Sequence, residues 1–312
     1  MWVDTKPSWI RTVLLGGFAL PHIWLRTAGV TFVSTIMTVL YETVPQVHYS
    51  ITSTPFTLIG LPLGIFLGFR NNAAYDRFWE GRKLWGSIVN TTRTVARQFL
   101  TMIDAPDASA AEQAELKTFQ QEMVRYVIAY THAVRYHLRD MTPLPRIARV
   151  IPEDEVCRYK DSDNVPIAML QRMGDRLLEA RRKKWIHPFH APMLEQSLSA
   201  LCDWQGGCER IKSTPIPYSY TVLLHRIVAV YCIMLPFGLM DAIKWATPVV
   251  VLFVSYCFFG LDAVGDELEQ PFGMDINDLP LKAISRTIER NLRERIGDEI
   301  PPKTAPKNGV LV

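Results

Sequence analysis

Long apolar stretches occur in two pairs along the chain, and a long charged region separates the pairs. The apolar ones are Ala28–Val44, Pro55–Phe69, Ser219–Met240 and Ala246–Leu261. A helix needs roughly 20 predominantly apolar residues to cross a bilayer, with about 17 at the short end of the range. The pattern therefore predicts four membrane-crossing helices, two in residues 28–69, of which the second continues into the cytosol, and two in residues 219–264.

Residues 70–218, between the second and third apolar stretches, are rich in charge. They hold 22 of the 34 Lys and Arg residues. Apolar side chains recur there at helical spacing, as in Phe119, Met123, Tyr126, Val127 and Tyr130. No useful length of strand-like alternation is present, so we expect an all-α protein with a cytosolic helical domain over residues 70–218.

The two ends of the chain have their own patterns. Residues 1–27 predict an interfacial segment, because glycines and Pro21 interrupt its apolar face. Residues 265–312 contain an amphipathic helix over Leu281–Ile296, with Arg286, Arg290 and Arg293 on its polar face. Such a helix needs a surface on which to bury its apolar stripe, and we expect disorder after Pro301.

Charge in the short loops predicts the topology. The loop Gln46–Thr54 has no Lys or Arg, and the link after the third apolar stretch has only Lys244. Short loops on the cytoplasmic side of a membrane are enriched in Lys and Arg. We therefore expect a multi-pass protein with both termini in the cytoplasm.

Composition agrees with this division and excludes several classes of protein. The 312 residues are 48% hydrophobic and 21% charged, with a net charge of +3. No basic run with interleaved aromatics indicates a nucleic-acid partner. Five scattered cysteines suggest free thiols in a reducing compartment. Motifs for a nucleophile elbow, a phosphate-binding loop or a metalloprotease helix are missing, so we expect no enzyme activity.

The second apolar stretch carries two stripes at a spacing of four residues. Leu61, Ile65 and Phe69 form a bulky stripe, and Gly60, Gly64 and Gly68 form one with no side chains. Residues four apart share a helix face. The bulky stripe could form a hydrophobic collar if copies of the helix surround an axis, or it could be ordinary helix packing.

Polar residues follow this stripe. Asn71 and Asn72 could meet ions with their amide dipoles or bond neighbouring helices, and both interpretations stay open. Further along, Arg226 lies within the third apolar stretch, where a charged group needs a partner. We expect a salt bridge from Arg226 to Asp262 or Glu80.

An oxygen-rich cluster follows the fourth apolar stretch. Asp275 and Asp278, with Glu267 upstream, are ligand types that calcium prefers. The spacing is not that of an EF-hand loop, and a helix-capping turn is the alternative. Calcium is the one cofactor that the residues suggest.

Three segments resemble the bestrophin family in its bacterial form. They are GFRNNAAYDRFWEGRKLWG at Gly68–Gly86, TPIPYSYTVLLHR at Thr214–Arg226 and PFGMDINDLPL at Pro271–Leu281. The resemblance implies a homopentameric channel for small monovalent ions in the inner membrane, with four membrane helices per subunit. It places a pore neck at Leu61, Ile65 and Phe69. In animal relatives the stretch that matches Pro271–Leu281 is more acidic and binds calcium, whereas here it has fewer acidic residues.

The resemblance also implies a second constriction at the cytosolic exit, on either Ile186 or Phe189. Family members conduct either anions or cations, and the sequence leaves the choice open. We therefore expect a passive ion channel gated at its neck, with membrane lipid and further copies of the chain as partners. The alternatives are a membrane-anchored helical scaffold or sensor and a secondary transporter.

Overall fold

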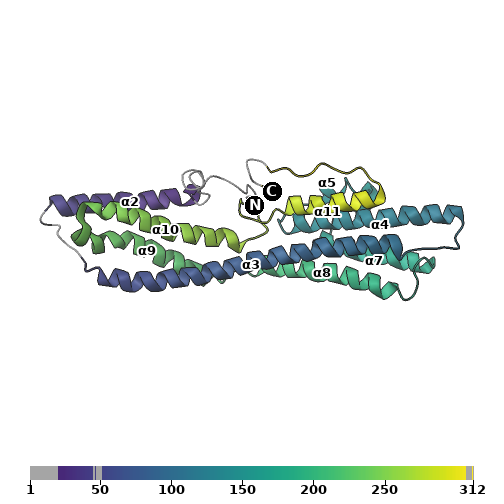
Figure 1. The fold of residues 1–312 in the computed structure, drawn as a ribbon, viewed down its shortest axis with the longest axis horizontal. Coiled ribbons are helices and arrows are strands. Elements are labelled where there is room, and N and C mark those ends of the chain that lie inside the picture. The colour runs from purple at the N-terminus through teal and green to yellow at the C-terminus, as the bar shows by residue number, and fades with distance from the viewer. Residues whose placement is uncertain (1–19, 45, 47–50, 307–310, 312) are drawn as a thin grey trace. The chain divides into compact units, whose positions relative to one another are not determined.

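Helices make up all the regular structure of this computed structural model, which describes residues 20–44, 46, 51–306 and 311. Figure 1 shows these helices as long rods. Within the described ranges, strand-like pairing is limited to one isolated bridge between Ile103 and Ile186. The predicted all-α fold is confirmed.

The chain forms two compact units, which divide at Phe78, Thr214 and Pro271. The first unit, here called the apolar unit, contains Pro215–Pro271 and the described residues before Trp79. Its helices are α2 (Leu20–Thr43), the first half of α3 (Thr54–Thr101), α9 (Tyr218–Ile243), the short 3-10 helix η2 (Lys244–Ala246) and α10 (Thr247–Glu269).

The second unit, here called the polar unit, contains Trp79–Thr214 and the chain from Phe272 onward. It holds the second half of α3 together with α4 (Ala110–His137), α5 (Leu144–Ile147), α6 (Glu153–Cys157), α7 (Val165–Arg182), α8 (Ala191–Ser213) and α11 (Leu281–Ile296). The boundary lies within α3, which is continuous for 48 residues. The prediction that the second apolar helix continues into the charged region is correct.

One of the predicted helix boundaries differs from the observed one. Helix α2 begins at Leu20, eight residues before the expected start at Ala28, because Pro21 is in the first turn, where it removes no helical hydrogen bond. The rest of the predicted interfacial segment, residues 1–19, lies outside the described residues. Helix α8 runs unbroken through Gly206 and Gly207. A Cβ at Gly207 would lie only 2.9 Å from Leu84, so this glycine permits close packing on α3.

Two stretches among the described residues are long and apolar enough to cross a membrane. They are Ile23–Thr43 and Tyr218–Glu269, and the second contains both α9 and α10. The apolar part of α3 does not meet the same test, because it ends at Arg70 after a short run. The two predicted helices in the C-terminal half correspond to α9 and α10, and α10 extends to Glu269.

The core of the apolar unit lies where α2, α3, α9 and α10 meet. Ile23, Leu63, Val228 and Val251 are buried there. Helix α3 joins this core through small residues. A Cβ at Gly60 would lie 2.7 Å from the Tyr231 hydroxyl, and one at Gly238 would overlap the ring of Phe56. These glycines therefore allow α3 and α9 to approach closely, as small residues do between membrane helices.

A buried ion cluster connects α3 to α10 where the apolar part of α3 ends. The Arg70 side chain is fully buried and its Nη1 lies 3.1 Å from Asp262 Oδ1, while its Nη2 pairs with Asp266. On the other side of Asp262, Oδ2 lies 2.6 Å from Nδ1 of His225 on α9. Asp262 is thus shared by a guanidinium and an imidazole, so three helices meet at one carboxylate.

The predicted ion pair of Arg226 is wrong. Asp262 is occupied by Arg70 and His225, and Glu80 pairs with Arg210 at 2.6 Å. Arg226 is exposed, with no ion pair to any described residue. The neighbouring residue on α9, His225, faces the carboxylate instead, because residues adjacent in a helix point about 100° apart.

The core of the polar unit is built around α4. Met123, Val127 and Tyr130 are fully buried, and the Tyr130 hydroxyl donates to the Leu201 carbonyl at 2.9 Å. Ser109 accepts a hydrogen bond from the backbone N–H of Glu112 and so caps the N-terminus of α4. Helix α11 has the predicted bounds, and its apolar stripe is buried through Leu281, Ile288, Leu292 and Ile296 against α4.

Glu289, on α11, is a buried carboxylate among basic side chains. Its Oε2 lies 2.5 Å from Arg146 Nη2 and 3.1 Å from His132 Nε2, and Arg286 and Arg293 pair with it as well. Burial raises the pKa of Glu289, but the His132 contact and the arginines outweigh it, so the pKa falls to about 2. Burial lowers the pKa of His132 to about 4, with the arginine charges adding to the effect.

We expect the Arg70→Met variant to be destabilised by about 3 to 5 kcal/mol, because Asp262 would be left buried without its guanidinium. The measurement is the thermal unfolding midpoint of the detergent-solubilised protein. Arg226→Met is the matched control, an arginine of the same unit without an ion pair, and it should change stability by less than about 1 kcal/mol. Equal effects of the two substitutions would contradict the assigned role of Arg70.

We expect the protein to lose stability as the pH falls from about 6.5 to about 4, because unfolded His132 binds a proton in this range and folded His132 does not. This contribution amounts to at most about 3 kcal/mol. The variant His132→Gln should flatten the pH dependence of the unfolding midpoint over that range, whereas His187→Gln, at an exposed position, should leave it unchanged. The same slope in His132→Gln and in the wild type would refute the assignment.

Candidate functional site: the exposed stripe of α3

The predicted neck residues form an exposed apolar stripe on α3. Leu61 is 72% exposed, Ile65 51% and Phe69 61%, and Leu58 continues the stripe toward the start of the helix. Pro62 lies within this part of α3 and has no N–H, so the Leu58 carbonyl receives no helical hydrogen bond from it. The exposed fractions show that Leu61, Ile65 and Phe69 lie on the surface of the chain and that none of them packs into its core.

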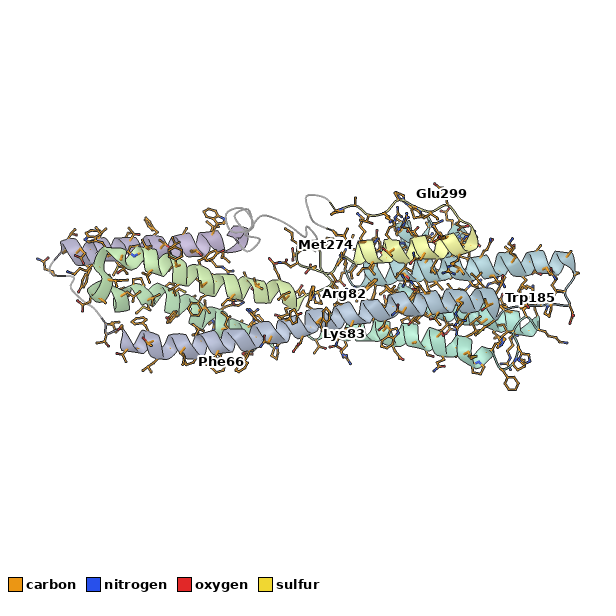
Figure 2. All side chains as sticks on the ribbon, viewed as in Figure 1. Phe66, Arg82, Lys83, Trp185, Met274 and Glu299 are labelled. Carbon is orange, nitrogen blue, oxygen red and sulfur yellow. The ribbon has the colours of Figure 1, made fainter. Side chains whose placement is uncertain are left out.

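The opposite face of the same segment is buried. Leu63 and Leu67 are 3% and 0% exposed, and Arg70 and Ala74 continue this face. Residues spaced by three and four positions share a face, so α3 has one face in the core and another outside it. Figure 2 shows Phe66, a further exposed aromatic residue, on this part of α3.

The three glycines beside the bulky residues differ in how closely other side chains approach them. Gly60 packs closely on Tyr231, whereas a Cβ at Gly64 or at Gly68 would have no neighbour within 4 Å. Only the first glycine is thus explained by packing within the chain. The other two lie beside the exposed stripe, where a smooth helix surface permits close approach of another molecule.

The two predicted polar residues below the stripe have different surroundings. Asn71 Nδ2 donates to the Leu261 carbonyl on α10 at 2.9 Å, so this side chain bonds a neighbouring helix. Asn72 is exposed. The structure therefore gives Asn71 a structural contact and leaves Asn72 as the amide that could meet a passing ion.

The two candidates for the cytosolic constriction also differ. Ile186 is 5% exposed and its backbone pairs with Ile103, while Phe189 is 81% exposed. Phe189 stands in the turn before α8, where its ring contacts His187 at a centroid distance of 5.4 Å. Only Phe189 has a large side-chain surface available to a pore.

The predicted calcium ligands form a closed turn. The backbone N–H of Asp275 donates to Asp278 Oδ2 at 2.6 Å, and that of Asp278 donates to the Asp275 carbonyl at 3.1 Å. Asp278 is 3% exposed, and Glu267 belongs to α10 in the other unit. One of the Asp278 carboxylate oxygens is thus already used in the turn. The Asp278 carboxylate closes this turn on the Asp275 backbone, and neither aspartate caps α11, whose N-cap residue Pro280 has no side-chain hydrogen bond.

One other set of metal-ligand types is close in space among the described residues. It consists of His225, Asp262 and Asp266, whose ligand atoms lie within 4.8 Å of one another. The Arg70 guanidinium, however, contacts both aspartates, so a cation already neutralises them. We interpret the group as the ion cluster described above.

Sequence reasoning missed the role of Arg70. The sequence pattern shows Arg70 only as the first charged residue after an apolar run, whereas in the structure it forms the centre of the ion cluster. The available signal was the pair of aspartates at Asp262 and Asp266, because carboxylates four residues apart on an apolar helix require a buried cation. Their distance of about 190 residues from Arg70 in the sequence concealed the pairing.

Comparison with known proteins gives consistent results. Residues 1–294 match the family described as Bacterial/Fungal Bestrophin protein. A voltage-dependent anion channel-forming protein of Mesorhizobium japonicum is 36% identical over 98% of this chain and 95% of its own length. A protein of the same name from Escherichia coli strain K12 is 34% identical over 98% of both chains.

Solved structures agree with the sequence matches. The crystal structure of a bacterial bestrophin homologue from Klebsiella pneumoniae superposes with a TM-score of 0.81 at 34% identity, over 89% of this chain and 99% of that one. A related crystal structure is described as that of a membrane protein. The predicted resemblance is therefore confirmed, and the chain belongs to the bacterial bestrophin family.

Proposed function

We propose that this protein is the pore-forming subunit of a bestrophin-type ion channel in a bacterial inner membrane, with Leu61, Ile65 and Phe69 forming the neck. It is a channel-forming membrane protein and not an enzyme. The observation that carries the proposal for the neck is the exposed stripe of α3. Large apolar side chains that the chain itself does not bury must face lipid, another copy or a pore.

The chemistry of the stripe suits a gate. The side chains of Leu61, Ile65 and Phe69 present neither charge nor hydrogen-bonding groups to an ion. A narrow passage lined by them therefore disfavours water and opposes ion entry. Stripping an ion of its water without replacement is far more unfavourable than apolar contacts can offset. The passage therefore conducts only when the side chains separate enough for water to enter.

The same side chains cannot select ions by charge. Selectivity has to come from polar groups elsewhere along the path, among which Asn72 is exposed. Phe189 is our candidate for the constriction at the cytosolic exit, because of its exposure. The names of the relatives, which are those of anion channel-forming proteins, support anions as the permeant ions.

The assembly and the topology belong to the same proposal. A ring of five copies follows from the family resemblance, and both termini are placed in the cytoplasm by the distribution of Lys and Arg among the loops. Four membrane helices per subunit would correspond to α2, the first half of α3, α9 and α10. Calcium has no part in the proposal, because the Asp275–Asp278 turn already satisfies a carboxylate.

The proposal is tested by current through the purified protein in planar bilayers under a KCl gradient. The wild type should conduct with a reversal potential shifted toward that of chloride. Replacing Leu61, Ile65 and Phe69 together with alanine should raise the basal current by roughly tenfold or more, because a wider and less apolar neck holds water more readily.

The control for this experiment is the double variant Ile59→Ala and Phe66→Ala. Both residues are about half exposed on the same stretch of α3, but they lie off the stripe. Their replacement should leave the basal current within about twofold of the wild type. A shift toward the potassium potential would contradict anion selectivity, and saturable, gradient-coupled flux would indicate a transporter. No current at all would favour a membrane-anchored scaffold or sensor.

A further inference from the structure

Two adjoining cavities lie in the polar unit between α3, α11 and the chain segment that follows α11. They have volumes of about 620 and 490 Å³ and share Arg93, Asn291 and Glu294 in their lining. Both volumes fall in the range of small-molecule sites, which is roughly 300 to 1,000 Å³. The two cavities adjoin at these three residues and are together called the basic cavity.

The lining of the basic cavity is strongly cationic. One carboxylate, that of Glu294, faces six basic side chains, which are Arg93, Arg97, Arg286, Arg290, Arg295 and Lys303. Even with full compensation by Glu294, the lining keeps an excess of positive charge. Concave surfaces lined by one sign of charge concentrate ions of the opposite sign.

Most of this charge is not neutralised within the chain. The side chains of Arg97, Arg295 and Lys303 have no hydrogen-bond or ion-pair partner among the described residues. The Arg93 guanidinium donates to the neutral amide of Asn291 at 2.9 Å. Other arginines of the same unit do have carboxylates. Arg125 makes two bonds to Asp298, and Arg172 makes two to Glu155. The basic cavity thus contains guanidinium groups that are available to a ligand.

The chain after α11 forms one wall of the cavity, and its contacts extend past Pro301, where the sequence predicts disorder. Gly297 adopts a left-handed conformation with φ of 74°, and the chain turns back along α11 (Figure 1). The bidentate Arg125–Asp298 pair fixes the start of this segment, and Glu299 follows it (Figure 2). Arg286 and Arg290 then donate to the carbonyls of Pro302 and Pro301, which brings Lys303 to the cavity.

The arrangement of the cations points to an extended anion. Arg97 and Arg295 line one cavity, Arg290 and Lys303 line the other, and Arg93 lines both. Arg93 and Arg97 lie one turn apart on α3 and line the same cavity. A single phosphate would contact the cations of one cavity, whereas a chain of phosphates would reach guanidiniums in both. The planar forks of these guanidiniums match phosphate oxygens.

We propose that the basic cavity binds an oligophosphate anion, either free or as the triphosphate of a nucleotide. The ligand would contact Arg93, Arg97 and Arg295, with Arg290 and Lys303 at the other end. This site is separate from the neck, and its occupancy does not depend on whether the protein conducts ions. The nearest competing occupant is an acidic segment of a second copy, which would fill the cavity in the assembled protein.

The test is calorimetric titration of the purified full-length protein in detergent with sodium tripolyphosphate and, separately, with ATP. We expect binding of one anion per protomer, weaker at about 0.3 M than at about 0.05 M salt because of screening. Equal affinity for the two would identify the phosphate chain as the recognised group, and tighter binding of ATP would show that the base also makes contacts.

The decisive comparison uses matched pairs of substitutions. Arg97→Gln with Arg295→Gln should weaken binding by about tenfold or more. Arg149→Gln with Arg182→Gln removes the same charge from exposed sites outside the cavity and should leave binding within about twofold. Lys303→Gln, at an exposed position, gives a second reduction if the first pair fails to fold. No heat from the wild type, or equal losses in both pairs, would overturn the proposal.

Discussion

The opposite burial of the two faces of α3 is the constraint on which the account depends. Leu63 and Leu67 commit one face to the core of the apolar unit, and Gly60 sets the contact with Tyr231. With that face fixed, the helix has no freedom to rotate and bury Leu61, Ile65 and Phe69. The exposed stripe therefore results from packing elsewhere on the same helix, and the chain requires something outside itself to meet these side chains.

Arg70 explains how the apolar first half of α3 can continue directly into a charged second half. Its guanidinium lies on the buried face, one turn beyond Leu67, where Asp262 and Asp266 receive it. A charge at this position would oppose burial in an apolar environment without those carboxylates. The cluster also includes His225, so α3, α9 and α10 are connected at the point where the apolar run ends.

The sequence was sufficient for features that depend on local pattern. The helical periodicity of α4 and the stripe of α11 predicted these helices closely, because an amphipathic pattern and its burial are the same property. It was insufficient where partners lie far apart in the chain. Arg226 was given the carboxylate that Arg70 and His225 occupy, since composition does not show which of two neighbouring residues on a helix faces inward.

In the candidate sites too, features set by local spacing were predictable from the sequence, and contacts between distant segments were not. The spacing of Leu61, Ile65 and Phe69 correctly placed them on one face, and the structure adds that this face is exposed. The basic cavity was not predictable, because Arg93 and Arg97 on α3 meet Arg290 and Arg295 on α11 only after folding. For the acidic turn, the ligand types suggest calcium, whereas in the structure the Asp278 carboxylate accepts a hydrogen bond from the Asp275 backbone N–H and closes the turn.

The central claim, that the exposed stripe of α3 lines the pore of an assembled channel, is tested most directly by cysteine accessibility. Ile65→Cys and Phe66→Cys, which are adjacent and equally exposed in one chain, are compared after replacing the native cysteines by serine. A charged, membrane-impermeant thiol reagent is applied while current flows. The account predicts rapid modification and block at position 65 and neither at position 66. Modification at position 66 with position 65 unreactive would contradict it.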